Sequence, residues 1–435
     1  MARPKRRAAL AGLAFVLAAC TPAEPPPRPN VLLVTLDTTR ADRLGAYGNP
    51  SGVTPNLDRL AAESIVYTHA LAPSSWTLPS HASLFTGKFT SSHGARYDPQ
   101  GPLVLTDVIP GKPGWERIRA RGLEGDQITL ATLLSEAGYA TGAVVAGPWL
   151  MRVMGLDAGF AFYSDAGIES VNGRLAADVT DTALAWLSEP REPFFLFLNY
   201  FDAHAPFSPP AGFLRKDAPA PPGLSAKEAR RLARYEGEIR YMDHHLGRLL
   251  AGLRELGLYD STWILVTADH GEALGEHGTR GHGSTLYQEV LHVPLIMRYP
   301  HGAEGPARRS DLVQLVDLLP TILHRLALPT PPGIQGSPID GLSHPVVAEV
   351  YPLMDGGRGA LRAQLTDGYK FLWRSDGRHQ LFDVEADPGE LEDLLRREPR
   401  RAARMARTLS SYLKGLPTPP RAGTSREVSP ETREA

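Results

Sequence analysis

The sequence of 435 residues has very little cysteine and almost no excess charge. Cys20 is the only cysteine, so an intrachain disulfide is excluded. The formal net charge is -2 at pH 7, and this balance gives no reason to expect nucleic acid as a partner. Apolar residues make up 42% of the chain, enough for a sizeable core. The length is too great for one small domain and too short for three full ones.

Apolar runs long enough to span a bilayer are also missing. The run from Ala8 to Ala19 follows a basic patch and is too short for a permanent transmembrane helix. It ends in LAAC, and small residues before a lone cysteine resemble the lipobox of bacterial lipoproteins. We therefore expect residues 1–20 to be a signal peptide, with Cys20 lipidated. The alternative is an ordinary cleaved secretory signal with an incidental cysteine.

The N-terminal features together predict where the protein resides. Residues 21–29 are rich in proline and suit an extended tether between a lipid and a folded domain. We expect an exported protein that is lipid-anchored to the bacterial cell envelope and faces the periplasm.

Alternating strand and helix patterns occupy most of the remaining chain. Four apolar, β-branched or aromatic runs are typical of strands buried on both faces, at 30–36, 193–201, 261–268 and 293–297. Helical patterns cover 54–64, 130–137, 175–187 and 225–256. The last begins with Ser225 and Glu228 in capping-box spacing. This alternation predicts an α/β fold with a large, mostly parallel sheet between helices.

The C-terminal region has a different pattern. Short apolar segments followed by a basic helical pattern predict a small antiparallel sheet with one helix packed on it. We place the main domain at 30–342 and this subdomain at 343–415. Residues 416–435 are rich in proline and charge, which is typical of a disordered tail.

Acidic and imidazole groups follow three of the predicted strands. Asp37 follows the first strand, Asp202 and His204 the second, and Asp269 and His270 the third. Ligands of open α/β sheets gather at the carboxyl ends of strands. Clustered carboxylates repel one another unless a cation lies between them, so the pattern indicates a divalent metal. A single aspartate at a strand end would more simply cap the next helix.

A second candidate lies in SSWTLPSHASLFTGK, residues 74–88. Pro79 predicts the first turn of a helix that runs towards Gly87, with Thr77 at its N-terminus. Free N–H groups there favour an anion, and contact with a metal would lower the hydroxyl pKa. Thr77 is thus a candidate nucleophile, although alone it would more simply be an N-cap.

Five blocks of the chain resemble successive blocks of the sulfatase family, which belongs to the alkaline-phosphatase superfamily. They are NVLLVTLDTTRADRLGAYG, TPNLDRLAAESIVYTHALAPSSWTLPSHASLFTG, EIRYMDHHLGRLL, WILVTADHGEALGEHGTRGHGSTLYQEVLHVPLIMRYP and HQLFDVEADPGELEDL. The resemblance runs from residue 30 to about residue 395. It implies the fold of that family, hydrolysis of sulfate or phosphate esters, and a small anionic ester or a sulfated or phosphorylated glycan as substrate.

The resemblance also assigns roles. The expected metal ligands are Asp37, Thr77, Asp269 and His270. The family implies Ca²⁺, and the mixed oxygen and nitrogen donors also suit Mn²⁺ or Zn²⁺. Thr77 takes the nucleophile position, and His204 that of the histidine that binds the substrate anion. His282 stands where many members contact substrate or leaving group, and we expect both histidines to be catalytic. His81 is expected to bind substrate.

The sequence departs from the sulfatase pattern in three places. Sulfatases carry Cys or Ser, oxidised to formylglycine, in C/S-x-P-S-R, whereas this chain reads TLPSH at residues 77–81. A threonine cannot give that aldehyde, and His81 replaces the arginine. Thr38 replaces the second acid of the usual pair. Pro206 stands where two-zinc relatives place a histidine after Asp202, although Asp202, His204 and His282 could still assemble a second site.

These departures leave several functions open. The first is a hydrolase that uses a metal-activated Thr77. The alternatives are a phosphodiesterase or phosphonate hydrolase, or a transferase of the phosphoethanolamine type, which usually carries transmembrane helices. A non-catalytic envelope protein on the same fold is disfavoured by the intact set of candidate residues.

Overall fold

The main sheet has eight strands and lies at the centre of the protein. The computed structural model describes residues 28–109, 115–215, 223–341, 345–351 and 359–417. The strand order is β11-β2-β10-β9-β1-β8-β6-β7. Their bounds are Ala307–Gln314, Ile65–Leu71, His292–Arg298, Thr262–Thr267, Asn30–Leu36, Phe194–Tyr200, Ala140–Val144 and Phe162–Ser164. The four predicted apolar runs are confirmed as β1, β8, β9 and β10.

The sheet is mixed but mostly parallel, as predicted. β1 pairs in parallel with β8 and β9, and β6 pairs in parallel with β7 and β8. Only β10 runs against its two neighbours among these eight strands. Residues of β1 are buried on both faces, because each face of the sheet carries helices.

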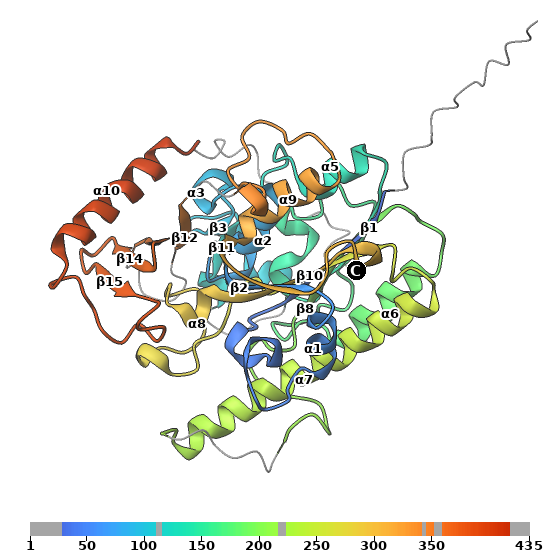
Figure 1. Ribbon diagram of the computed structural model, residues 1–435, viewed down its shortest axis with the longest axis horizontal. Helices are drawn as coiled ribbons and strands as arrows, with labels where there is room; N and C mark the ends of the chain where they lie inside the picture. Colours follow the sequence, from blue (N-terminus) through green and yellow to red (C-terminus); the bar gives the residue numbers. More distant parts are fainter. Residues whose placement is uncertain (1–27, 110–114, 216–222, 342–344, 352–358, 418–435) are drawn as a thin grey trace, which may run out of the picture.

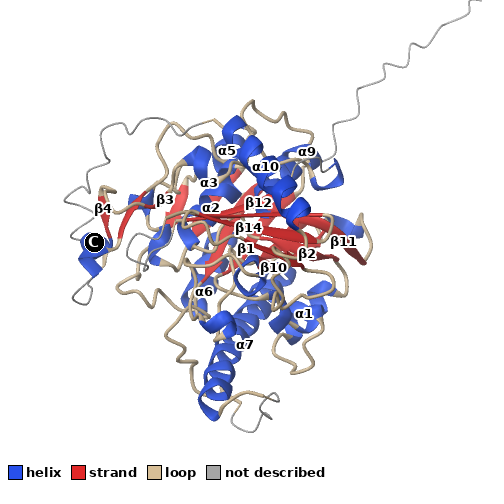
Figure 2. Cartoon of the chain, turned by 90° about the vertical axis from the view of Figure 1, so that its left-hand side faces the viewer, coloured by secondary structure: helices blue, strands red, loops and turns tan. Residues whose placement is uncertain are grey.

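Helices cover both faces of the sheet (Figures 1 and 2). Their bounds are α1 Pro55–Ala61, α2 Thr77–Thr86, α5 Leu130–Glu136, α6 Ala176–Leu187, α7 Ala226–Glu255 and α9 Leu318–Arg325. Helices α1, α6 and α7 pack with Leu32 and Val34 of β1 in one core cluster. Helices α2, α5 and α9 pack on the other face with Val31 and Leu33. This alternation along β1 is the period of two expected of a strand.

Short helices and a small sheet complete the main domain. The short helices are α3 Thr90–His93, α4 Leu105–Val108 and α8 Gln288–Leu291. The small sheet orders its strands β3-β5-β4, with bounds Arg96–Tyr97, Arg119–Arg121 and Leu103–Val104.

The C-terminal subdomain matches its prediction. Strands β12 to β15 form an antiparallel sheet in chain order, with bounds Val346–Val350, Leu361–Thr366, Tyr369–Arg374 and Gln380–Asp383. Helix α10, Pro399–Gly415, packs Met405 and Leu409 against this sheet and against Phe89 of the main domain. The predicted fold class is therefore confirmed.

The two ends of the chain bear on the predictions of export. The predicted signal peptide, most of the tether and nearly all of the predicted tail lie outside the described residues. Within the described part of the chain, no helix combines the length and the apolar character that a transmembrane span needs.

Candidate active site

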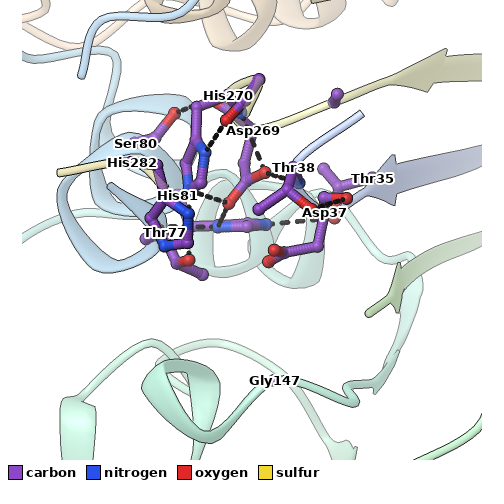
Figure 3. Close-up of polar contacts among 12 residues, drawn as sticks. Thr35, Asp37, Thr38, Thr77, Ser80, His81, Gly147, Asp269, His270 and His282 are labelled. Carbon is purple, nitrogen blue, oxygen red and sulfur yellow. Dashed lines mark hydrogen bonds and ion pairs between the residues drawn. The ribbon is translucent and has the colours of Figure 1, made fainter. Parts of the chain in front are cut away.

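Two neighbouring strands bring the predicted metal ligands together. β1 and β9 are parallel, with Val34 opposite Val266, so their carboxyl ends meet at one edge of the sheet. Asp37 follows β1 directly, and Asp269 and His270 lie just beyond β9. These three side chains are fully buried and place ligand atoms within 4.8 Å of one another (Figure 3). The predicted cluster of these three residues is thus assembled.

Backbone donors fix the orientation of the Asp269 carboxylate. The N–H groups of Thr38 and His270 donate to Asp269 Oδ1 at 3.1 and 2.8 Å. Thr38 adopts a left-handed φ of 52°, which costs a non-glycine residue about 1–2 kcal/mol. The hydroxyl of Tyr235 donates to the Thr38 carbonyl at 2.6 Å and helps to hold this turn. The position where sulfatases carry a second acid therefore supplies a backbone donor here.

Three carboxylate oxygens of the cluster form no hydrogen bond with any described residue, although His81 Nδ1 lies 3.6 Å from Asp269 Oδ2. Both oxygens of Asp37 and Oδ2 of Asp269 are buried without a hydrogen-bond partner among the described residues. Burial, with repulsion from Asp269, raises the pKa of Asp37 well above its ordinary value. Unpaired buried carboxylates are costly unless a cation compensates them. The two carboxylates and the imidazole therefore fit a divalent metal ion.

The tautomer of His270 suits metal binding. Its Nδ1 lies 2.9 Å from the Gly271 carbonyl, an acceptor, so Nδ1 carries the proton. Nε2 is left as a lone-pair donor, 3.3 Å from Asp269 Oδ2. A hydrogen bond from the distant ring nitrogen to a backbone carbonyl is the usual way to orient a metal-ligating histidine.

Helix α2 presents Thr77 to this cluster. Trp76 occupies the N-cap position and Thr77 is the first helical residue, so Thr77 is not simply an N-cap. Its Oγ1 lies 3.3 Å from His270 Nε2. The hydroxyl of Ser80 donates to the Asp269 carbonyl at 2.6 Å and ties the first turn of α2 to the end of β9. The Thr77 hydroxyl thus lies at a positive helix end, beside the carboxylate cluster.

His282 and His204 connect the buried cluster with the surface. The ring of His282 lies 4.5 Å from that of His270 and 4.9 Å from that of His204, between centroids. His282 Nδ1 is 2.9 Å from Oε2 of the buried Glu272, which orients the ring. His204 stacks on Phe201 and its Nδ1–H donates to the Ala205 carbonyl at 2.7 Å. Desolvation, aided by His282, lowers the pKa of His204 to about 3. Both rings are partly exposed, whereas His270 is fully buried.

His81 occupies a deeper position. Its Nδ1 donates to the Thr77 carbonyl at 2.9 Å and lies 3.6 Å from Asp269 Oδ2. Its Nε2 is 3.0 Å from Thr35 Oγ1, and the side chain is fully buried. Both ring nitrogens are thus within reach of protein atoms, a geometry that favours positioning of Thr77 and Asp269. Substrate binding by His81 stays a prediction.

Asp202 does not join the metal cluster. Both of its carboxylate oxygens accept from the Ala176 N–H at 3.1 Å, at the start of α6. The hypothesis of a second site built from Asp202, His204 and His282 receives no support, because no such group appears among the described residues. Asp202 therefore accepts from the start of a helix, as the simpler explanation of a strand-end aspartate proposed, but the helix is α6, which precedes β8, and not the next one in the chain.

Asp202 and Glu238 are expected to make stability depend on pH. Burial raises the pKa of Asp202 to about 7 and that of Glu238 to about 8. The folded protein therefore keeps protons that the unfolded chain releases at about pH 4. The free energy of unfolding falls as the pH rises from about 4 to about 7 or 8, by up to roughly 4 kcal/mol for Asp202. Urea unfolding between pH 5 and pH 8 should show a flatter slope for Asp202→Asn than for the wild type. An unchanged slope would contradict the assignment.

Sequence reasoning missed three residues that support the site. Glu272 orients His282, and its place directly after the aspartate, histidine and glycine of ADHGE was the available signal. The amide of Asn199 donates to Thr35 Oγ1 at 3.2 Å, which in turn contacts His81. Neither Asn199 nor Thr35 is distinguishable in sequence from an ordinary polar residue within an apolar strand.

The chain is similar to a known family and to several known proteins. The sulfatase family model matches residues 29–327. An arylsulfatase of Clostridium perfringens is 26% identical, over 85% of this chain and 91% of that protein. A phosphonate monoester hydrolase of Agrobacterium radiobacter superposes with a TM-score of 0.71 at 21% identity, over 89% of this chain and 95% of the other.

A second solved structure has the same fold and a bound ligand. It was determined in complex with its substrate, D-glucosamine-2-N,6-O-disulfate. It superposes with a TM-score of 0.71 at 19% identity, over 89% of this chain and 98% of the other.

Proposed function

Because the chain belongs to the sulfatase family of ester hydrolases, we propose that it hydrolyses sulfate or phosphate esters with Thr77 as the covalent nucleophile. One observation carries this proposal. The Thr77 hydroxyl lies at the N-terminus of α2 and 3.3 Å from His270 Nε2, beside carboxylate oxygens that form no hydrogen bond with any described residue. Ser80 lies in the same turn of α2, but its hydroxyl donates to the Asp269 carbonyl at 2.6 Å.

Asp37, Asp269, His270 and Thr77 are the residues that would hold a divalent ion. Ca²⁺ is the ion typical of the family, and the donor set also suits Mn²⁺ or Zn²⁺. When bound there, the ion supplies positive charge that lowers the pKa of the Thr77 hydroxyl and neutralises the ester anion. The orphaned carboxylates of Asp37 and Asp269 are the reason to expect it.

Each side chain of the site has its own role in the proposed reaction. The Thr77 hydroxyl first loses its proton to solvent. Thr77 Oγ1 then forms a bond to sulfur or phosphorus while the bond to the leaving oxygen breaks, and the leaving oxygen takes a proton from a histidine. His282 is placed for that donation because Glu272 holds its Nδ1, so Nε2 is the nitrogen free for the substrate. His204 is proposed to hold a non-bridging oxygen through Nε2–H, because the ester anion favours the doubly protonated ring while Nδ1–H stays on the Ala205 carbonyl. Water then attacks the same sulfur or phosphorus atom, returns a proton to the histidine that protonated the leaving group, and displaces Thr77 Oγ1 as the alkoxide.

A threonine at this position bears on which ester is cleaved. Thr77 cannot become formylglycine, so the usual sulfatase route through that aldehyde is not open to it. A threonine that carries a phosphoryl group is the alternative, and the fold is shared with a phosphonate monoester hydrolase. We therefore keep phosphodiesters and phosphonate esters beside sulfate esters as substrates, and a glycan as the carrier of the ester.

A panel of model esters tests the proposal. Metal-loaded protein is assayed with 4-nitrophenyl sulfate, bis(4-nitrophenyl) phosphate and 4-nitrophenyl phenylphosphonate. We expect nitrophenol release from at least one of them, and its loss in EDTA. Release that requires an added acceptor would instead identify a transferase. A metal-loaded protein that cleaves none of the three, nor any sulfated or phosphorylated glycan, would refute the proposal.

Membrane attachment through Cys20 is a separate proposal that rests on the LAAC sequence. Cys20 lies outside the described residues, and the support is the basic patch, the short apolar run and the small residues before it. Mature protein should fractionate with membranes, and Cys20→Ser should release it or leave it unprocessed. Mass spectrometry of the mature N-terminus decides the matter. An unmodified N-terminus beyond residue 20 would contradict lipidation.

A further inference from the structure

A pocket lined with cations opens beside the candidate active site. Four of its residues lie in the first turns of α7, and a fifth comes from the segment before His282. The basic pocket, as we call it, is defined by Lys227, Arg230, Arg231, Arg234 and Arg280. Its remaining wall is the segment 205–208, which follows His204 directly. The cavity has a volume of about 410 Å³.

The charge of the basic pocket is largely uncompensated. Lys227, Arg230, Arg234 and Arg280 are exposed, and none of them forms an ion pair with any described residue. One carboxylate, that of Glu228, also lines the pocket; it accepts hydrogen bonds from Ser225 in the capping box of α7 and interacts electrostatically with Arg280. Five cationic side chains thus share the pocket lining with one acidic side chain. The chain as a whole carries a net charge of only -2, so this concentration of positive charge is local.

The pocket adjoins the catalytic groups through one carboxylate. Arg231 Nη2 lies 3.7 Å from Glu272 Oε1, and the other oxygen of Glu272 holds His282. The guanidinium of Arg231 also lies over the ring of Phe207, 4.9 Å from its centroid, and its Nε is buried with no acceptor among the described residues. Glu272 thus contacts Arg231 of the basic pocket through one carboxylate oxygen and His282, the proposed proton donor, through the other.

We propose that the basic pocket binds a second anionic group of the substrate, so that the substrate is a multiply charged glycan ester. This inference rests on the proposed function, because it places the ester itself at Thr77. A neighbouring sulfate, phosphate or carboxylate on the glycan would then meet Arg230, Arg234 and Arg280. A simple aryl ester has no group to place there.

The shape of the pocket favours a glycan over a bilayer surface. The cavity is concave and its wall is continuous with His204, so a group that enters it remains connected to the ester beside the catalytic histidines. The headgroups of a flat bilayer would also meet the exposed arginines, but they would not be joined to an ester at Thr77. Binding to anionic membranes is therefore the competing explanation that the experiment must separate.

The test measures oligosaccharide binding to a variant that lacks the proposed nucleophile. Metal-loaded Thr77→Ala protein is titrated with a fluorescein-labelled, heparin-derived hexasaccharide, separately with its desulfated, N-acetylated counterpart, and separately with phosphatidylglycerol vesicles. The triple variant Arg230→Gln/Arg234→Gln/Arg280→Gln is made in the same background. We leave Arg231 unchanged because it pairs with Glu272. The matched control is Arg400→Gln/Arg404→Gln/Arg407→Gln, which removes three exposed charges from α10.

We expect the triple variant to raise the Kd for the sulfated hexasaccharide by about 10-fold or more, a loss of about 1.4 kcal/mol. Its affinity should also depend less on salt, because exposed charges are screened. The α10 control should bind as the unmodified background does. In protein with Thr77 intact, the hexasaccharide should inhibit any nitrophenyl ester turnover competitively.

Three results would overturn the inference. They are equal affinities of the triple variant and the α10 control, equal affinities for the sulfated and desulfated hexasaccharides, and a triple variant that loses only binding to phosphatidylglycerol vesicles. Failure of the proposed function is distinguishable. In that case no ester is hydrolysed, while the sulfated hexasaccharide still binds through the basic pocket.

Discussion

Replacing Thr77 by alanine should reduce kcat/KM by a factor on the order of 10⁴ or more and leave the fold intact and the metal bound, because the ligands Asp37, Asp269 and His270 remain. Loss of a covalent nucleophile has effects of this size in other enzymes. The Thr77 side chain is fully buried but small, and its hydroxyl lies within hydrogen-bond reach of one described side-chain atom, His270 Nε2. The truncation therefore removes the attacking atom and little packing. Activity is measured with the nitrophenyl ester that the wild type cleaves best.

Two further substitutions at Thr77 sharpen the test. Thr77→Ser keeps the hydroxyl at the start of α2 and should retain measurable activity. Thr77→Cys should give little sulfatase activity, because His81 stands in place of the arginine of the sulfatase motif. Circular dichroism and metal analysis serve as controls for folding and occupancy. If Thr77→Ala turned over any ester at close to the wild-type rate, bound water or another side chain would have to be the nucleophile.

The sequence carried most of the information about the fold and the metal ligands. Asp37 and Asp269 could be placed together because each follows a run that is apolar on both faces, and parallel strands end at a common edge. The position of Thr77 followed from Pro79 and Gly87, which mark the two ends of α2. Such positions can be predicted from local sequence, because the direction of a strand and the ends of a helix fix them.

Contacts between segments that are distant in sequence could not be predicted from such local features. The antiparallel course of β10 depends on how β2 pairs with it, since its sequence is as apolar as that of a parallel strand. The carboxylate of Asp202 turns to α6 because the Ala176 N–H happens to lie opposite, 26 residues away in sequence. The basic pocket likewise needs α7 and Arg280 to meet beside His204.

Comparison of Asp37→Asn with the wild type should separate the metal-binding role of Asp37 from any role in folding. Burial and repulsion from Asp269 raise the pKa of Asp37, so the metal-free protein loses stability as the pH rises above about 4, where an unfolded aspartate ionises. Asparagine has a similar shape and no charge. In EDTA at pH 8 the variant should therefore have a higher Tm than the wild type.

With metal added, the order should reverse. A ligand at 100 times its Kd stabilises the folded state by about 2.7 kcal/mol, so the Tm of the wild type should rise with Ca²⁺, Mn²⁺ or Zn²⁺. Asp37→Asn should gain little, because one carboxylate of the cluster is gone. Asp269→Ala should also lose the metal, but with a lower Tm in EDTA, since the N–H groups of Thr38 and His270 lose their acceptor. Full metal occupancy in Asp37→Asn, measured by elemental analysis, would exclude Asp37 as a ligand and leave its two unpaired oxygens unexplained.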